Sequence, residues 1–139
     1  MNKKIIGIIG QGFVGTAVRE GLDNFYNIET YDKFKDSTCS SLEELVECCD
    51  FIFLCLPTPM KKTGQCDLSI VKEAVFAIDS MNKEKILVIK STVPPGTTES
   101  LNKECQNINV VFNPEFLTEA NYLEDFKNQN RIIVGGKRP

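Results

Sequence analysis

Gly10-Gln11-Gly12-Phe13-Val14-Gly15 is the stretch of sequence that decides the fold. It fits the pattern G-x-G-x-x-G, which carries information only when a strand precedes it and a helix follows it. Residues 4–9 form an apolar run typical of a strand, and Val14, Val18 and Leu22 then recur every four residues, as on one apolar face of a helix. The stretch therefore predicts a phosphate-binding turn at the start of a βαβ unit.

Each glycine has a predicted task in such a turn. Gly10 permits the tight turn, Gly12 lets a pyrophosphate approach the backbone, and Gly15 lets the helix pack close to the strand. Phe13 and Val14 lie in the first turn of that helix, whose exposed N–H groups and positive dipole attract phosphates. The glycine turn is therefore a candidate dinucleotide site.

Asp32 supplies the acidic residue that this motif requires about 20 positions further on. It directly follows a predicted strand at residues 28–31, where its carboxylate can accept both ribose hydroxyls of an adenosine and repel a 2′-phosphate. This position predicts NAD as the cofactor, although Lys33 and Lys35 nearby weaken the preference over NADP. The alternative is a glycine turn beside an ordinary surface aspartate.

Strands and helices alternate along the rest of the chain. Further strands are predicted at 51–56, 86–89, 109–112 and 131–134, and further helices at 42–46, 70–81 and 97–105, with 115–126 helical or irregular. Ser40 or Ser41 is expected to cap the first of these helices and Thr97 or Thr98 the third, while Asp67 or Ser69 is expected to begin the second. Strands separated by helices run parallel with right-handed crossovers, so residues 1–139 are predicted to form one α/β domain, a doubly wound parallel sheet of the Rossmann type.

Composition excludes several classes of function. Of the 139 residues, 42% are apolar and 25% are charged, which is ordinary for a globular protein. A net charge of −3 without a basic cluster argues against nucleic acid as a partner, and no apolar run approaches the length of a membrane span. The apolar N-terminus is interrupted by glycines and is too short for a secretory signal, so we expect a cytoplasmic protein. Its six cysteines include no C-x-x-C pair and the chain has no histidine, so we expect reduced thiols and no metal site.

Three unusual strings begin where predicted strands end: Leu56-Pro57-Thr58-Pro59, residues 90–97 (KSTVPPGT) and residues 113–119 (NPEFLTE). The carboxyl ends of parallel strands share one edge of the sheet, where ligands bind. The hydroxyls of Thr58 and Thr92 can hold a water or a ribose oxygen there, and Glu115 or Glu119 can act as a base. Alternatively, the prolines only terminate strands and Glu119 is a solvated helix residue.

These three strings, together with the glycine turn and Arg131-Ile132-Ile133-Val134-Gly135, occur in the same order in the UDP-glucose/GDP-mannose dehydrogenase family. The chain resembles the N-terminal NAD-binding domain of that family, whose members oxidise the C6 hydroxyl of a nucleotide sugar to a carboxylate with two NAD molecules in turn. The resemblance implies catalytic roles for Thr92 and Glu115. It implies that a UDP-sugar contacts Glu115, Phe116, Leu117 and Glu119, and that NAD is held by Gly10, Gly12, Phe13, Val14, Gly15, Asp32, Pro57, Thr58 and Thr92.

The sequence also departs from the family. No cysteine here has the context of the family's nucleophile, which lies in a later domain, and we expect the central helix and C-terminal domain to be absent. The stretch 32–41 is shorter than in the family. We therefore expect NAD binding with little or no turnover by the chain alone. Apolar surface left bare after Val134 predicts a homo-oligomer or a C-terminal partner.

Other functions remain open at this point. The chain could be a self-standing dinucleotide-binding module or one subunit of a split enzyme, for which the short 32–41 connection would be the mark. A relative of 6-phosphogluconate dehydrogenase is a third alternative, against which the string Asn113-Pro114-Glu115-Phe116-Leu117 argues.

Overall fold

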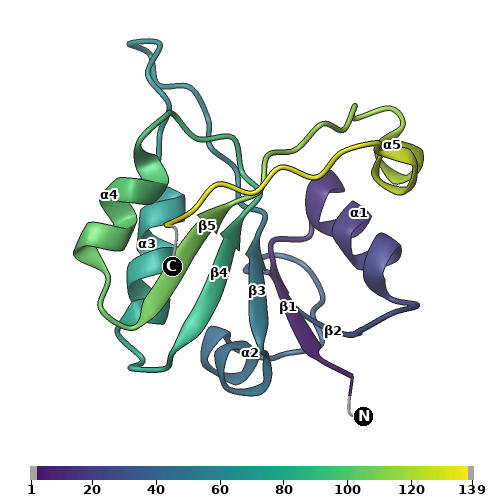
Figure 1. The fold of residues 1–139 in the computed structure, drawn as a ribbon, viewed down its shortest axis with the longest axis horizontal. Helices are drawn as coiled ribbons and strands as arrows, with labels where there is room; N and C mark the ends of the chain where they lie inside the picture. Colours follow the sequence, from purple (N-terminus) through teal and green to yellow (C-terminus); the bar gives the residue numbers. More distant parts are fainter. Residues whose placement is uncertain (1–2, 138–139) are drawn as a thin grey trace.

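A five-stranded parallel sheet forms the centre of the computed structural model, which describes residues 3–137 (Figure 1). The strands are β1 (Ile5–Ile9), β2 (Asn27–Tyr31), β3 (Phe51–Leu54), β4 (Lys85–Ile89) and β5 (Ile108–Phe112). The helices are α1 (Phe13–Leu22), α2 (Leu42–Cys48), α3 (Ser69–Asp79), α4 (Thr97–Glu104) and α5 (Tyr122–Asn128). The strand order is β2-β1-β3-β4-β5, which confirms the predicted doubly wound α/β fold.

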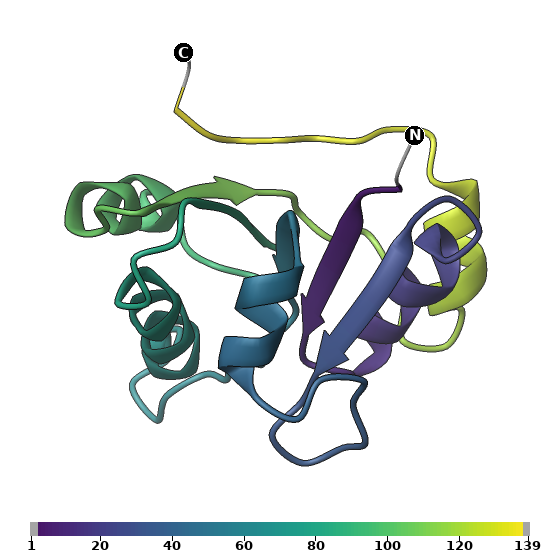
Figure 2. The same cartoon turned by 90° about the horizontal axis from the view of Figure 1, so that it is seen from below.

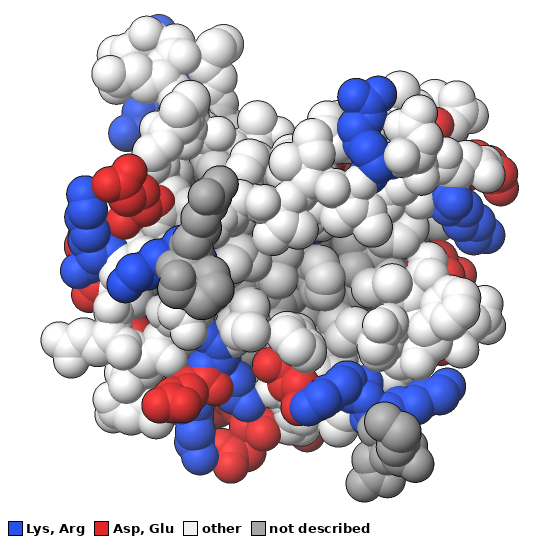
Figure 3. All heavy atoms as spheres, in the orientation of Figure 1, with Lys and Arg blue, Asp and Glu red and all other residues white. Residues whose placement is uncertain are grey.

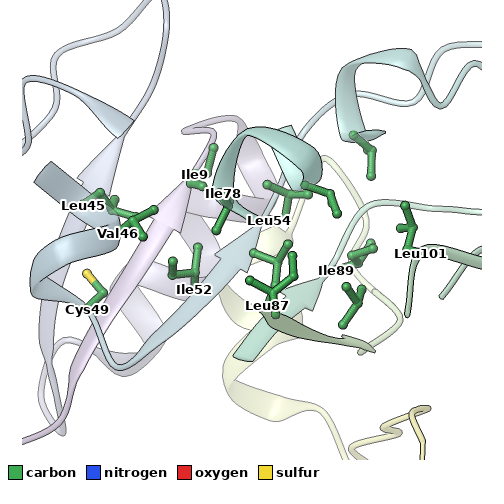
Figure 4. Close-up of a cluster of buried hydrophobic side chains, with 14 of the residues drawn as sticks. Ile9, Leu45, Val46, Cys49, Ile52, Leu54, Ile78, Leu87, Ile89 and Leu101 are labelled. Carbon is green, nitrogen blue, oxygen red and sulfur yellow. The ribbon is translucent and has the colours of Figure 1, made fainter. Parts of the chain in front are cut away.

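One face of the sheet is closed by α2, α3 and α4. Alternate residues of the central strands, such as Ile52, Leu54, Leu87 and Ile89, point to this face and are fully buried (Figure 4). They pack against helix residues such as Val75, which is also fully buried. This core positions the carboxyl ends of β3 and β4 side by side, because Leu54 and Ile89 are paired in register.

The opposite face is covered unevenly. Helices α1 and α5 pack together over β1, where Ile6, Ile8 and Val18 form a second, smaller core with Phe126 at its margin (Figure 2). Over β4 and β5 the only cover visible in Figure 1 is the segment 131–137, which crosses in front of them. Ile86 of β4 consequently stays 38% exposed, and Figure 3 shows the middle of this face nearly without charged side chains.

The strand predicted at 131–134 does not form. This segment is extended, but its described pairing with β5 is a single antiparallel bridge between Gly135 and Phe112, supported by the Asn113 amide, which donates to the Ile133 carbonyl at 2.8 Å. Ile132 remains 74% exposed. Residues 132–134 are apolar and β-branched, as in a strand, but a strand needs several paired partners, and this segment crosses the sheet with one bridge.

Helix starts were predicted with mixed success. Ser41 caps α2 by accepting the N–H of Glu44, as predicted. The predicted threonine cap of α4 is wrong, because Gly96 in a left-handed conformation (φ 85°) is the capping residue. The hydroxyl of Thr97 instead donates to the Pro94 carbonyl at 2.8 Å. Backbone geometry after the two prolines decided the start of this helix.

On each outer strand of the sheet, β2 and β5, a side chain takes up backbone hydrogen-bonding groups that no neighbouring strand uses. Beside β2, the backbone N–H of Thr30 donates to the Thr38 hydroxyl at 2.8 Å, and the N–H of Thr38 donates to the Thr30 hydroxyl at 3.1 Å. Beside β5, the amide of Asn102 both donates to the Val110 carbonyl (2.7 Å) and accepts the Val110 N–H (2.8 Å). The short 32–41 connection thus returns along β2 and takes the place of a further strand.

All six cysteines are unpaired thiols, as expected. Cys39 and Cys49 are buried. Burial, and to a smaller extent the nearby Cys48, raises the pKa of Cys39 to about 11. The same causes raise the pKa of Cys49 further. Burial also raises the pKa of Cys55 to about 12. Cys48 itself is exposed. Because the thiolate is the reactive form, the buried thiols are inert at neutral pH.

We therefore predict that iodoacetamide at pH 8 alkylates Cys48 well before Cys39, Cys49 and Cys55. Peptide mass spectrometry of timed samples measures the order of labelling. Labelling of Cys55 as fast as Cys48 in the folded protein would contradict the described burial, and unfolding in urea should remove the difference.

Candidate functional site

The glycine turn is built by close approaches of the backbone. Gly10 has a φ of 91°, donates its N–H to the Tyr31 carbonyl at 2.9 Å, and would place a Cβ 2.4 Å from the Cys55 carbonyl oxygen. A Cβ at Gly15 would lie 1.9 Å from the carbonyl oxygen of Gly10. Both glycines are therefore required by the protein itself, Gly10 for the turn and Gly15 for the contact of α1 with β1, as predicted.

Gly12 differs from its two partners. Its φ of −73° is open to any residue, and nothing lies within 4 Å of the place where its Cβ would be. It precedes α1 without any side-chain cap, so no side chain takes up the first N–H groups of that helix. Phe13 is 41% exposed beside it, while Val14 is half-buried. The space at Gly12 fits a ligand group that needs bare backbone and N–H donors, as a pyrophosphate does.

Asp32 lies at the end of β2 and faces the glycine turn. Its Oδ2 accepts the N–H of Gln11 at 2.7 Å, and its Oδ1 accepts those of Phe34 (2.9 Å) and Lys35 (3.2 Å). Burial alone would raise the pKa of Asp32, but these backbone hydrogen bonds and the Lys35 charge outweigh it and lower the pKa. A carboxylate offers about four lone-pair sites. Three are used, which leaves one free.

Gln11 and Lys35 complete this corner. Sequence reasoning gave Gln11 no role and considered Lys35 only as a charge that weakens the preference for NAD. The Gln11 side chain is 7% exposed, donates to the Asp36 carbonyl at 2.8 Å and accepts from Arg19 at 3.0 Å. The Lys35 ammonium donates to the Gln11 carbonyl at 2.7 Å. The motif leaves the residue between its first two glycines unspecified, so no signal in the sequence pointed to Gln11.

The segments that follow β3 and β4 are joined by hydrogen bonds. The Leu56 N–H donates to the Ser91 hydroxyl at 3.0 Å, and that hydroxyl contacts the Leu54 carbonyl at 3.4 Å. The Thr58 hydroxyl donates its proton to the Thr92 carbonyl at 2.7 Å. It can therefore accept a hydrogen bond from a ligand but not donate one. Thr92 is exposed, and its own hydroxyl has no hydrogen bond among residues 3–137. Pro57 lies exposed between these contacts.

Lys90 and Glu115 form a buried charge pair where β4 and β5 end. The Lys90 side chain is 3% exposed, donates to Asn113 Oδ1 at 3.0 Å, and holds its Nζ 3.4 Å from Oε2 of Glu115. Oε1 of Glu115 accepts the Leu117 N–H at 2.8 Å, whereas Oε2 is buried without a hydrogen-bond partner. Sequence reasoning gave Lys90 no role, although a lysine ending an apolar strand is buried only when it is paired.

The remaining predicted residues lie further out on the same loop. Phe116 is 50% exposed, and the Arg131 guanidinium lies 5.9 Å from the centre of its ring. Leu117 contributes only its backbone N–H to Glu115. Glu119 is exposed and makes no polar contact within the part of the chain that the structure describes. The structure therefore holds Glu115 at the carboxyl edge of the sheet, paired with Lys90, and leaves Glu119 exposed to solvent.

Contacts run without interruption along the carboxyl edge of the sheet. They lead from Asp32 through the glycine turn to Cys55, whose N–H donates to the Ile9 carbonyl at 2.8 Å, and on through Ser91 and Lys90 to Glu115. The prediction that the glycine turn and the three strings share one edge is confirmed. Residues 3–137 contain no group of three potential metal ligands and no helix long and apolar enough to cross a membrane.

Replacing Lys90 tests this charge pair. Lys90→Met should lower the free energy of unfolding by about 3–5 kcal/mol, because it leaves a buried carboxylate without its counter-ion. The double variant Lys90→Met, Glu115→Gln should recover most of the loss. Urea unfolding measures both, and Lys103→Met, which removes the exposed pair with Glu99, should change little. Equal losses in the single and double variants would show that charge is not the reason.

Known proteins share this arrangement. The model of the UDP-glucose/GDP-mannose dehydrogenase family, NAD binding domain, matches residues 18–139. The chain is 43% identical over 89 residues to a UDP-glucose 6-dehydrogenase of Rickettsia bellii (60% of this chain, 20% of the relative). It is 36% identical over 104 residues to UDP-glucose 6-dehydrogenase TuaD of Bacillus subtilis (69% and 23%). It thus spans about a fifth of the length of these curated relatives.

A solved structure extends the likeness to the glycine turn, which precedes the matched residues. The UDP-glucose dehydrogenase of the archaeon Pyrobaculum islandicum superposes with a TM-score of 0.85 at 27% identity, covering 99% of this chain and 41% of that one. Since the family model matches far more than half of the residues, the chain belongs to the UDP-glucose/GDP-mannose dehydrogenase family and comprises its NAD binding domain.

Proposed function

We propose that this chain holds NAD for the oxidation of the C6 hydroxyl of a nucleotide sugar, UDP-glucose, to a carboxylate. The observation that carries the proposal is the bare space at Gly12, which faces the N-terminus of α1 and lies next to Asp32. Residues 1–139 act as one NAD-binding domain in this proposal. The oxidation itself is a property of the longer relatives, of which this chain spans about a fifth.

NAD would lie along the carboxyl edge from β2 towards β4. The turn from Gly10 to Gly15, with Phe13 and Val14, would take the pyrophosphate, and Asp32 one ribose hydroxyl. Pro57, Thr58 and Thr92 would take the nicotinamide half. The Lys35 ammonium is held by the Gln11 carbonyl, which supports NAD over a cofactor with a 2′-phosphate.

Thr92 and Glu115 are proposed to act beside the reacting carbon. NAD, when bound, supplies the acceptor for the hydride that leaves this carbon. The Thr92 hydroxyl is exposed and can orient a water or the sugar hydroxyl. Oε2 of Glu115 is an acceptor without a hydrogen bond, so it can take up a proton or align a water while Lys90 balances its charge. Phe116, Leu117 and Glu119 would line the sugar-phosphate side.

The covalent step of the second oxidation needs a thiolate. Cys55 lies within range of the charges of Lys90 and Glu115, but burial raises its pKa to about 12, which argues against it as that nucleophile. We therefore propose that the chain alone binds NAD without converting UDP-glucose. A cytoplasmic location accompanies this proposal, because NAD is an intracellular cofactor.

Alanine substitutions at Gly12 and Gly15 distinguish an effect on NAD binding from an effect on stability. Gly12→Ala should leave thermal unfolding unchanged, because the new methyl group meets no protein atom, but should weaken NAD binding at least about tenfold by filling the pyrophosphate space. Gly15→Ala should instead destabilise the protein, because its Cβ would lie 1.9 Å from a backbone oxygen. Isothermal titration calorimetry and thermal unfolding measure these effects. Absence of heat with millimolar NAD and the unaltered chain would refute the proposal.

The open sheet face around Ile86 supports a second part of the proposal, a homo-oligomer joined through this face. Ile132 and Val134 on the crossing segment are 74% and 64% exposed, and Ile86 beneath is 38% exposed. Apolar surface gathered in this way favours association. A partner polypeptide is the alternative cover.

Sedimentation equilibrium tests the homo-oligomer. The chain should show a mass above that of the monomer at high concentration, and Ile86→Lys should return it to a monomer. Ile70→Lys is the matched control, since Ile70 is 40% exposed but lies on α3, on the covered side of the sheet. A monomer at all concentrations would contradict the homo-oligomer and favour the partner polypeptide.

A further inference from the structure

Phe34 is an apolar side chain without packing partners beside the proposed nucleotide site. Its ring is 92% exposed, more than any other large hydrophobic side chain of the described residues. A single exposed aromatic residue is ordinary on a protein surface, so exposure alone decides nothing. Phe34 differs from the others in the backbone that carries it.

The loop of residues 32–37 is held rigidly around Phe34. The Phe34 N–H donates to Oδ1 of Asp32 at 2.9 Å, and the Asp32 N–H donates to the Ser37 hydroxyl at 2.8 Å. The Lys35 ammonium and the Gln11 side chain tie the same loop to the glycine turn, at 2.7 Å and 2.8 Å. The backbone is therefore fixed at both ends while the ring contacts little. Such pre-ordering lowers the entropy lost when a ligand binds.

The chemistry of adenosine places a base at this point. In the proposed function, Asp32 takes a hydroxyl of the adenosine ribose, and the base is attached to the neighbouring carbon of that sugar. The Asp32 carboxylate that takes the hydroxyl also accepts the Phe34 N–H. The adenine base and the Phe34 ring are therefore both attached close to this carboxylate. An exposed aromatic face on a fixed backbone is suited to stacking on a purine.

We propose that the ring of Phe34 is the surface on which the adenine of bound NAD stacks. This inference rests on the proposed function and adds the residue that recognises the adenine half. Lys33 and Lys35 are the neighbours of Phe34 in the sequence. The Lys35 ammonium donates to the Gln11 carbonyl, and the Lys33 ammonium lies 3.9 Å from Glu73, so both charges have other partners.

Calorimetric titrations of the full chain test the stacking surface. Phe34→Ala should weaken NAD and ADP-ribose by the same factor, about tenfold, and should not change the affinity for nicotinamide mononucleotide, which lacks the adenosine half. Phe34→Leu, which keeps apolar bulk without the aromatic face, should recover only part of the loss. Phe25→Ala is the matched control: Phe25 is 67% exposed and lies between α1 and β2, at the opposite edge of the sheet.

Fluorescence gives a second, direct readout, because the chain contains no tryptophan. Phe34→Trp should introduce emission that NAD and ADP-ribose quench by stacking, whereas emission from Phe25→Trp should not respond. Unchanged NAD affinity in Phe34→Ala, with the unaltered chain binding NAD, would overturn this inference and leave the proposed function standing. Failure of the unaltered chain to bind NAD would overturn both.

Discussion

The contact between the backbone of Gly10 and the helix at Gly15 is the constraint on which the rest of the structure depends. It brings α1 so close to β1 that no Cβ fits, and this closeness turns the N-terminus of the helix towards the carboxyl edge of the sheet. The neighbouring strand ends then take their places around the turn. Gly10 also contacts Tyr31 and Cys55, so β2 and β3 flank the same few atoms. The positions of these strand ends around the glycine turn therefore follow from the packing of the protein itself.

Local pattern was enough to predict most of the fold. The apolar run of β3, the four-residue spacing on α1 and the Ser41 cap each report an interaction made within a few residues, so the sequence reveals them directly. The site could be located for a related reason. Parallel strands bring their carboxyl ends to one edge, so three unusual strings after three strands had to meet there.

What could not be predicted depends on partners distant in the sequence. Residues 131–134 have the composition of a strand, but whether they pair is decided by the path of the chain after α5. Gln11 and Lys35 contact one another across 24 positions, and Lys90 is paired with Glu115 across 25. Nothing local marks such pairs. Two of the three N–H groups bonded to Asp32, those of Phe34 and Lys35, likewise depend on how the 32–37 loop turns, and with the Gln11 N–H they limit what this carboxylate can still bind.

The side chains that seal the two margins of the sheet have a consequence for how copies of this protein can meet. An unpaired strand normally offers its amides as a template on which another chain can add, the first step towards fibrils. Here the hydroxyl of Thr38 takes up the N–H of Thr30 in β2, and the carboxamide of Asn102 takes up both backbone groups of Val110 in β5. Continuous sheets shared between molecules are thereby disfavoured. An incoming strand would have to displace these side chains before it could pair with β2 or β5.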